Sequence, residues 1–204
     1  ALIRDFPDLY QLYSEKEYSF NKIRQHNRNN LLWRDPAVDG LKTGYTQAAG
    51  YGLASSAKRD GMRLISVVLG SGSESARVSE SQSLLNYGFR FFETVQLYKA
   101  SQELAQGKVW KGEEEQIRLG IADDLYITIP RGRYDDLDAQ VEMRPELIAP
   151  IAEGEEVGRI IIRLEDEEYA NRGLVALETA TEAGFFGRTW DGLSMWFGGL
   201  FEDD

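Results

Sequence analysis

The strongest constraint on the fold is the pair Asp60-Gly61, which lies between two apolar runs at residues 49–57 and 62–70. Asp-Gly between two such runs is a strong signal for a tight β-hairpin turn, because both residues tolerate positive φ. The sequence therefore predicts two antiparallel strands joined at residues 58–61.

A third segment, residues 38–46, precedes this hairpin and contains Lys42-Thr43-Gly44. We expect it to be a strand of the same antiparallel series and one wall of a cleft. A lysine ammonium supplies positive charge for a carboxylate and can take part in proton transfer, while a threonine hydroxyl can donate a hydrogen bond. Glycine has no side chain, so a substrate backbone can lie against the strand. On its own, the triplet is more typical of a surface turn.

Other segments of the chain favour the strand that lines a cleft over the surface turn. Together with Lys-Thr-Gly, they resemble the low-molecular-mass penicillin-binding proteins, the D-alanyl-D-alanine carboxypeptidases of the penicillin-binding protein 5 and 6 type. The resemblance runs from about Phe6 to the C-terminus. The segments that carry it, in chain order, are residues 27–33, 38–44, 49–51, 62–66, 88–94 and 128–133.

This resemblance implies a serine acyl-transfer enzyme that removes the terminal D-alanine from peptidoglycan pentapeptides and binds β-lactam antibiotics. Lys42 is then the lysine of the third family motif, and Thr43 and Gly44 lie against the substrate. Tyr45, where the family often has histidine, would offer its backbone N–H to an oxyanion hole, which needs only a placed amide. Arg28 matches an arginine that the family uses near the substrate carboxylate.

The other two family motifs, Ser-x-x-Lys and Ser-x-Asn, have no convincing match. Ser-x-x-Lys occurs at Ser19 and at Ser55, but the nucleophile must begin a buried helix so that serine and lysine share one face. Residues 18–23 alternate like a strand, and Ser55 lies in an apolar run. We therefore expect the chain to begin partway through the transpeptidase-like domain, after the nucleophile.

The amino-acid composition excludes several other enzyme classes. The chain has one histidine, His26, and no cysteine, so a multi-histidine zinc site and thiol catalysis are excluded. No cofactor or metal is implied. The acidic runs at residues 113–115 and 165–168 lack the interleaved glycine of a calcium loop, and we read them as solvated turns. With a net charge of -11, nucleic-acid binding is not expected.

Charge divides the chain near Phe92. Residues 1–92 carry a net charge of +3 and residues 93–204 a net charge of -14. We predict an α+β fold with three parts: the C-terminal portion of a transpeptidase-like catalytic domain at 1–92, an all-β sandwich at 93–180, and an amphipathic helix at 181–204. A helix at residues 79–92 closes the first part.

Short strands at close spacing predict the sandwich. Side chains of Leu125, Ile127 and Ile129 share one face, as do those of residues 137, 139, 141 and 143. We see no catalytic constellation here, and expect a stalk or a surface for protein partners. The predicted strands are residues 107–110, 116–119, 125–129, 137–143, 157–164 and 174–177.

The tail predicts a helix that lies in a membrane surface. At helical spacing its apolar residues fall on one side, and tryptophan favours the membrane interface. A helix packed on its own protein is the other interpretation, although glycines at 187, 192, 198 and 199 weaken it in water. The apolar residues are Phe185, Phe186, Trp190, Leu193, Trp196, Phe197, Leu200 and Phe201.

Two functions follow as expectations. The first is part of a D-Ala-D-Ala carboxypeptidase in the bacterial periplasm, attached to the outer face of the inner membrane and holding peptidoglycan stem peptides that end in D-Ala-D-Ala. The second is a non-catalytic envelope module that binds a partner through the β domain and the tail. A β-lactamase-like hydrolase fits the β-rich extension less well.

Overall fold

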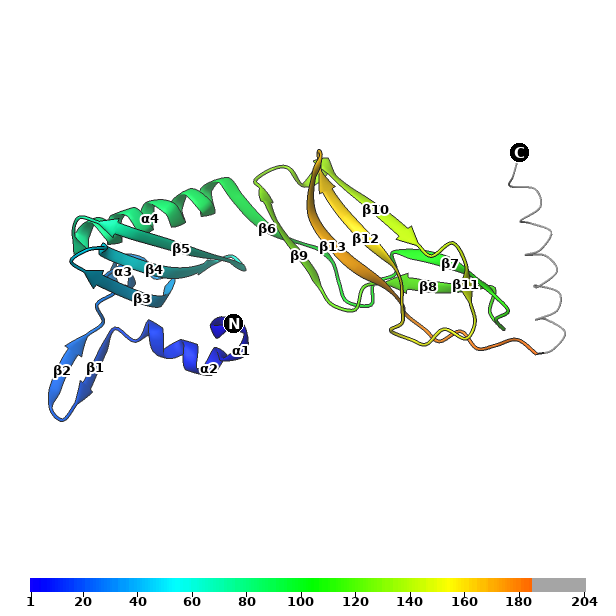
Figure 1. Cartoon of the computed structure of the whole chain (residues 1–204), viewed down its shortest axis with the longest axis horizontal. Coiled ribbons are helices and arrows are strands. Elements are labelled where there is room, and N and C mark those ends of the chain that lie inside the picture. Colours follow the sequence, from blue (N-terminus) through cyan, green and yellow to red (C-terminus); the bar gives the residue numbers. More distant parts are fainter. Residues whose placement is uncertain (185–204) are drawn as a thin grey trace. The chain divides into compact units, whose positions relative to one another are not determined.

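The computed structural model describes residues 1–184, so most of the amphipathic helix predicted at 181–204 lies outside the described residues. Residues 181–184 are not helical as predicted, because Glu182 forms an isolated antiparallel β-bridge with Gly112. The chain divides into two compact units, Ala1–Thr94 and Val95–Asp204. Each is described by itself below (Figure 1). No helix within residues 1–184 combines the length and the apolar character needed to cross a bilayer.

The first unit is built around a three-stranded antiparallel sheet in the order β3-β4-β5. Asp60 and Gly61 both have positive φ, 48° and 82°, between β4 and β5, which confirms the predicted hairpin. The elements are α1 Leu2–Asp5, α2 Pro7–Tyr10, the 3-10 helix η1 Gln11–Ser14, β1 Glu17–Phe20, β2 Ile23–His26, α3 Leu31–Arg34, β3 Val38–Thr46, β4 Gly50–Arg59, β5 Met62–Ser71 and α4 Glu74–Phe91.

Helix α4 covers one face of this sheet. It starts five residues before the predicted Ser79, because Ser73 accepts a hydrogen bond from the Ala76 N–H and so caps the first turn. Val78 and Leu85 from the helix enter a core with Leu53 from β4. The other buried members of this core are Leu31, Leu32, Val38 and Ala57.

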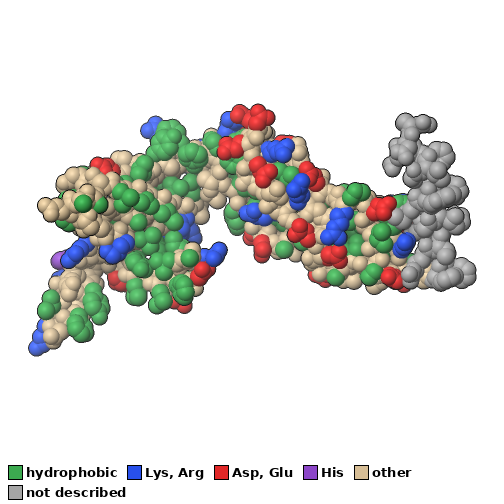
Figure 2. Space-filling view, in the orientation of Figure 1, with side chains coloured by type: hydrophobic (Ala, Val, Ile, Leu, Met, Phe, Trp, Pro, Cys, Tyr) green, Lys and Arg blue, Asp and Glu red, His purple; other side chains and the backbone are tan. Residues whose placement is uncertain are grey.

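The segment before α3 corrects one prediction. Instead of one strand at 18–23, the structure has the hairpin β1–β2, with Phe20 paired to Ile23. Asn21 and Lys22 form the turn with φ of 48° and 63°, a geometry that asparagine tolerates. Tyr18, Phe20 and Ile23 are all more than half exposed, and Figure 2 shows hydrophobic side chains on this part of the surface.

The second unit is an all-β sandwich with one 3-10 turn. A six-stranded sheet has the order β10-β12-β13-β8-β7-β11, and β6 pairs with β9 in a second sheet. The described elements are β6 Phe92–Tyr98, β7 Ala105–Trp110, β8 Gln116–Gly120, β9 Leu125–Pro130, η2 Tyr134–Asp136, β10 Leu137–Met143, β11 Leu147–Ile148, β12 Glu156–Leu164 and β13 Glu167–Ala176.

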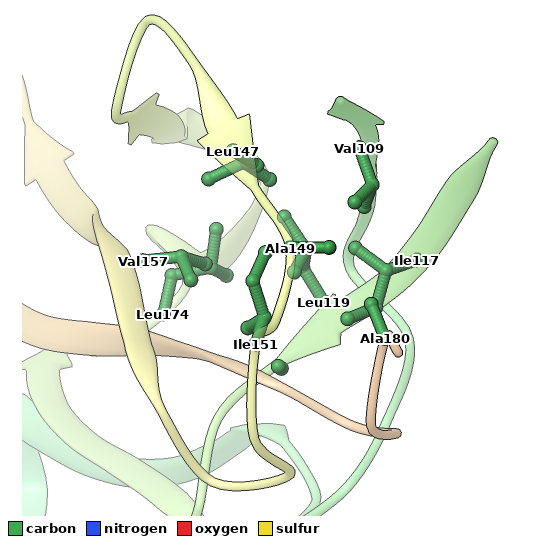
Figure 3. Close-up of a cluster of buried hydrophobic side chains, with 10 residues drawn as sticks. Val109, Ile117, Leu119, Leu147, Ala149, Ile151, Val157, Leu174 and Ala180 are labelled. Carbon is green, nitrogen blue, oxygen red and sulfur yellow. The ribbon is translucent and has the colours of Figure 1, made fainter. Parts of the chain in front are cut away.

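Two clusters of buried side chains hold the sandwich together. One includes Leu119, Val157 and Leu174 (Figure 3). The other places Ile127 and Ile129 of β9 against Ile160 and Ile162 of β12, as their alternation predicts. Burial of this apolar surface, at about 25 cal/mol per Å², stabilises the unit.

Several details of this unit differ from the predictions. Strand β13 begins at Glu167, seven residues before the strand predicted at 174–177, and strands β6 and β11 were not predicted. Strand β10 alternates apolar and polar residues, yet Val141 and Met143 are 37% and 43% exposed, because β10 is an edge strand that pairs only with β12 among the described strands. The acidic run at 165–168 is a turn only in its first half. Glu165 has φ of 56°, whereas Glu167 already pairs with Leu164 as part of β13.

Candidate active site

Strand β3 presents Lys42-Thr43-Gly44 on the edge of the sheet. Lys42, Thr43 and Gly44 pair with Ala54, Leu53 and Gly52 of β4, and no other described strand pairs with the opposite edge of β3. The backbone along that edge is therefore open to an extended peptide, which can add as a further strand.

The side chains of the motif flank this edge from both faces. Thr43 pairs with Leu53, whose side chain packs against α4, so Thr43 lies on the helix-covered face and Lys42 on the other. Thr43 is half-buried and Lys42 is exposed, with its Nζ donating a hydrogen bond of 2.6 Å to the Thr43 carbonyl. A Cβ built at Gly44 would meet no atom within 4 Å, so the approach to the motif is unobstructed.

The backbone of the loop at residues 27–30 places Arg28 beside the Lys-Thr-Gly motif. The loop at 27–30 is fixed by the buried Asn29, whose Nδ2 donates to the Gly40 carbonyl over 3.2 Å and whose Oδ1 accepts from the Leu31 N–H. The Arg28 side chain is exposed. Arg28 and Lys42 form none of the ion pairs found in residues 1–184, so both cations can receive a carboxylate from elsewhere.

Tyr45 follows the motif and is 58% exposed. Its ring lies 4.4 Å from that of Tyr51, its partner across the β3–β4 pair. The planes of the two rings are tilted by 36° relative to each other. The role of its backbone N–H in an oxyanion hole stays a prediction.

Neither serine of the two Ser-x-x-Lys matches has the setting of a nucleophile. Ser55 lies in β4, fully buried, with its Oγ 2.7 Å from the Ser66 Oγ. Ser19 lies in the exposed strand β1, and Lys22 in the turn that follows. Neither begins a helix, so serine and lysine are not displayed on one helical face.

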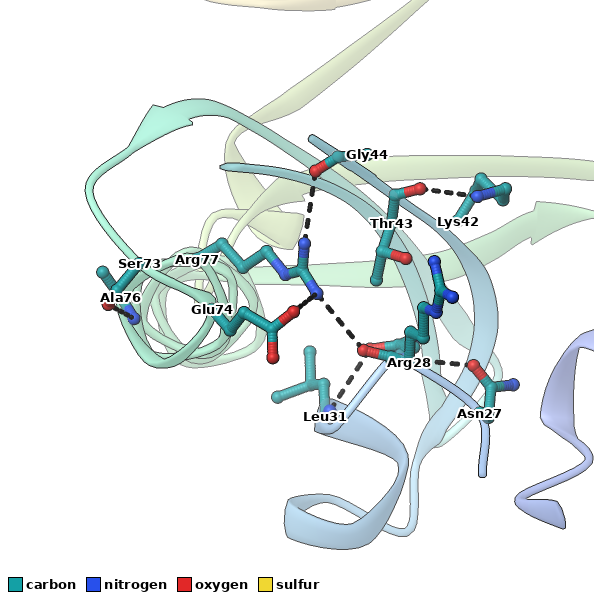
Figure 4. A network of polar contacts seen from close by, with 11 residues as sticks. Asn27, Arg28, Leu31, Lys42, Thr43, Gly44, Ser73, Glu74, Ala76 and Arg77 are labelled. Atoms are coloured by element: carbon teal, nitrogen blue, oxygen red, sulfur yellow. Dashed lines mark hydrogen bonds and ion pairs between the residues drawn. The ribbon is translucent and has the colours of Figure 1, made fainter. Parts of the chain in front are cut away.

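Two residues of the site were missed from sequence. Asn29 is one of the few fully buried polar side chains. Arg77 is 2% exposed, and donates from Nη1 to the Gly44 carbonyl and from Nη2 to the Arg28 carbonyl over 3.2 and 3.4 Å (Figure 4). Ser73-Glu74 is an N-cap followed by an acidic first turn. That signal would have placed Arg77 on the helix, although not in the core.

No group of three acidic or histidine side chains within residues 1–184 is arranged to hold a metal ion. His26 lies in strand β2, with its Nδ1 3.2 Å from a Glu17 carboxylate oxygen. Glu113 accepts a hydrogen bond from the Thr181 hydroxyl, and Glu165 pairs with Arg133. These carboxylates already have partners within their own unit.

An edge strand with Lys-Thr-Gly, a helix behind it and a following β-sandwich define the class of penicillin-binding serine carboxypeptidases. The chain belongs to the D-alanyl-D-alanine carboxypeptidase family of the penicillin-binding protein 5 type, which confirms the resemblance found in the sequence. The family model described as D-alanyl-D-alanine carboxypeptidase matches residues 1–73. A model of the penicillin-binding protein 5 C-terminal domain matches residues 92–182.

Individual relatives agree with this assignment. The chain is 45% identical to D-alanyl-D-alanine carboxypeptidase DacC of Escherichia coli over 98% of its own length and 52% of the relative's. It is 46% identical to E. coli DacA, over 97% and 51%. The solved structure of penicillin-binding protein 5 from Haemophilus influenzae aligns with a TM-score of 0.81 at 41% identity, covering 89% of this chain and 54% of that one. The chain thus spans about half the length of the curated relatives it matches.

Proposed function

We propose that this chain supplies the substrate-holding strand of a serine D-Ala-D-Ala carboxypeptidase, which trims the terminal D-alanine from peptidoglycan stem peptides and is acylated by β-lactams. The observation that carries the proposal is the open edge of β3, where Lys42, Thr43 and Gly44 are accessible and no described strand pairs. The family membership supports the same reaction.

In the proposed reaction, the terminal D-alanine lies along the open edge with its carboxylate beside the Thr43 hydroxyl and Arg28. Charge-assisted hydrogen bonds to a carboxylate are about twice as strong as neutral ones, so these groups orient the scissile bond. Gly44 leaves room for the peptide backbone. Lys42 holds positive charge at the cleft and assists proton transfer, and the Tyr45 N–H stabilises the oxyanion as the tetrahedral intermediate forms.

The attacking serine is not identified in this chain. A serine hydroxyl adds to the carbonyl carbon of the penultimate residue and the C–N bond to the terminal D-alanine breaks. The leaving amine takes up a proton, and water then hydrolyses the acyl-enzyme. We assign the serine to a Ser-x-x-Lys helix that faces the open edge of β3 from the opposite side of the bound substrate.

Labelling with a fluorescent penicillin tests whether this chain holds the ligand without supplying the nucleophilic serine. The chain alone should not be labelled covalently, whereas the chain joined to the amino-terminal half of E. coli DacA should be labelled and should release D-alanine from an acylated Lys-D-Ala-D-Ala peptide. In the joined protein, Lys42→Ala should slow acylation roughly 100-fold or more. Lys58→Ala, an exposed lysine on the adjacent strand β4, is the matched control and should leave it unchanged.

Two results would reject the proposal. Labelling of the isolated chain would mean that it carries its own nucleophile. Equal rates for the two lysine variants would mean that the motif strand does not hold the ligand. Absence of labelling in every form would instead favour the non-catalytic envelope module.

We also propose that residues 185–201 attach the protein to the periplasmic face of the inner membrane. The aromatic apolar residues of this segment support the proposal, because such side chains partition into the interfacial region of a bilayer. The full chain should sediment with phosphatidylcholine vesicles and do so at high salt as well as low. Deletion of residues 185–204 should leave it in the supernatant; continued sedimentation of the deleted form would contradict the anchor.

A further inference from the structure

Arg77 is a buried charge directly behind the candidate active site. It lies near the start of α4 and its side chain is 3% exposed. Long cationic side chains are rarely buried without a strong partner, because leaving water is costly for a charge. The burial of Arg77 therefore requires an explanation from its contacts.

Those contacts join two separate segments of the site. Nη1 donates to the carbonyl of Gly44 over 3.2 Å, and Nη2 donates to the carbonyl of Arg28 over 3.4 Å. Figure 4 shows the guanidinium between these two carbonyls, one from the motif strand and the other from the loop before α3. A planar fork of donors suits this task, since one rigid group can hold two acceptors at a fixed separation.

The charge of Arg77 is only weakly balanced within residues 1–184. Its one carboxylate partner is Glu74, at 3.5 Å and with a side chain 60% exposed, so water screens that pair. The Nε has no hydrogen-bond partner among the described residues, and the Tyr51 ring lies 5.5 Å from the guanidinium carbon. A simple structural ion pair does not explain this residue.

We propose that Arg77 is a positioning residue that sets the spacing between Arg28 and the Thr43-Gly44 strand, so that both contact the same substrate carboxylate. This inference rests on the proposed function. Arg77 is too buried to touch the substrate and acts through the two backbone carbonyls that it holds. Its unbalanced positive charge also favours an anion at this end of the strand.

The kinetic test compares two substrates in the protein joined to the amino-terminal half of DacA. One is an acylated Lys-D-Ala-D-Ala peptide with a free carboxylate, and the other is its C-terminal amide. Arg77→Gln should lower the ratio of kcat/KM for the acid over the amide at least tenfold. Arg90→Gln, an exposed arginine in the last turn of α4, is the matched control and should keep the wild-type ratio.

The Arg77→Lys variant separates the effect of the positive charge from the effect of the planar guanidinium group. A lysine keeps the positive charge but is a compact donor that does not hold both carbonyls in fixed geometry, so it should recover only part of the lost ratio. Full recovery with lysine would overturn the bridging role. An equal loss for acid and amide with Arg77→Gln would also overturn it, because that is the effect of general damage to the fold.

Hydrogen exchange gives an answer that does not depend on activity. In the chain as it stands, Arg77→Gln should speed exchange at least tenfold in peptides covering residues 27–30 and 43–46, and leave the β4–β5 turn at 58–63 unchanged. Unchanged exchange in the first two peptides, or a uniform increase across the sheet, would reject the inference. If the unaltered joined protein releases no D-alanine while these two peptides respond, the proposed function fails and the positioning contact stands.

Discussion

Replacement of Asn29 by aspartate should destabilise the first unit far more than its small change in shape suggests. Asn29 is 1% exposed and its Nδ2 donates to the buried Gly40 carbonyl. Aspartate keeps the acceptor for the Leu31 N–H but places a second acceptor against that carbonyl. The lost hydrogen bond costs about 1–3 kcal/mol. Burial of the carboxylate adds about 1.4 kcal/mol for each unit by which its pKa rises.

Together these effects give an expected loss of about 4 kcal/mol in the free energy of unfolding at pH 7, a large part of the stability of a typical domain. The pH dependence has a definite sign. Because the pKa of Asp at position 29 is higher in the folded state, the charge penalty is absent below the unfolded pKa and grows as pH rises through the folded pKa. A protonated carboxyl can also donate to Gly40 again, so the deficit should shrink between pH 7 and pH 4.5.

Urea unfolding followed by Trp33 fluorescence measures this deficit for the first unit alone, in a background where the other tryptophans are phenylalanine. Those are Trp110, Trp190 and Trp196. Asn30→Asp is the matched control, because Asn30 is exposed and its side chain makes no capping hydrogen bond at α3; its effect should stay within about 0.5 kcal/mol. Equal effects of the two substitutions at pH 7, or a deficit that grows on acidification, would refute the reasoning.

Contacts in the two units predict the effects of four further substitutions. Burial raises the pKa of Tyr10 to about 12, so its contribution to stability is full below pH 10 and falls by up to roughly 3 kcal/mol as pH rises toward 12; Tyr10→Phe should flatten that decline in urea titrations. Gly40→Ala would place a Cβ 2.9 Å from the Tyr10 Oη and should cost about 1–3 kcal/mol, whereas Gly44→Ala should spare stability but slow penicillin acylation. Leu174→Ala, fully buried in the sandwich, should cost about 2–5 kcal/mol in unfolding monitored at Trp110 and leave the Trp33 transition unchanged.

Local signals predicted much of the fold. Asp60-Gly61 specifies its hairpin because both residues accept positive φ at low cost, and neither needs help from the rest of the chain. The alternation of Leu125, Ile127 and Ile129 likewise identified a strand with one buried face. The same alternation in β10 did not give burial, because sequence does not reveal that this strand lies at the edge of its sheet.

The candidate site was predictable only in part. Lys42, Thr43, Gly44 and Arg28 follow from motifs, which report residue types at fixed spacing. No motif predicts the burial of Arg77. Its position depends on how α4 packs across the sheet, whose last strand, β5, ends six residues before Arg77. The turn at Asn21-Lys22 was also missed, because the apolar residues around it alternate as in a continuous strand.

The open edge of β3 also bears on self-association. Unpaired strand edges are templates for pairing with other copies of the same chain, and proteins often protect them with charge. In an antiparallel pairing of two β3 edges centred on Lys42, the Lys42 ammonium of each copy would lie opposite the same charge across the ladder. The lysine proposed to hold the ligand therefore also opposes aggregation through the same edge, and a neutral residue there would remove the charge on which both effects depend.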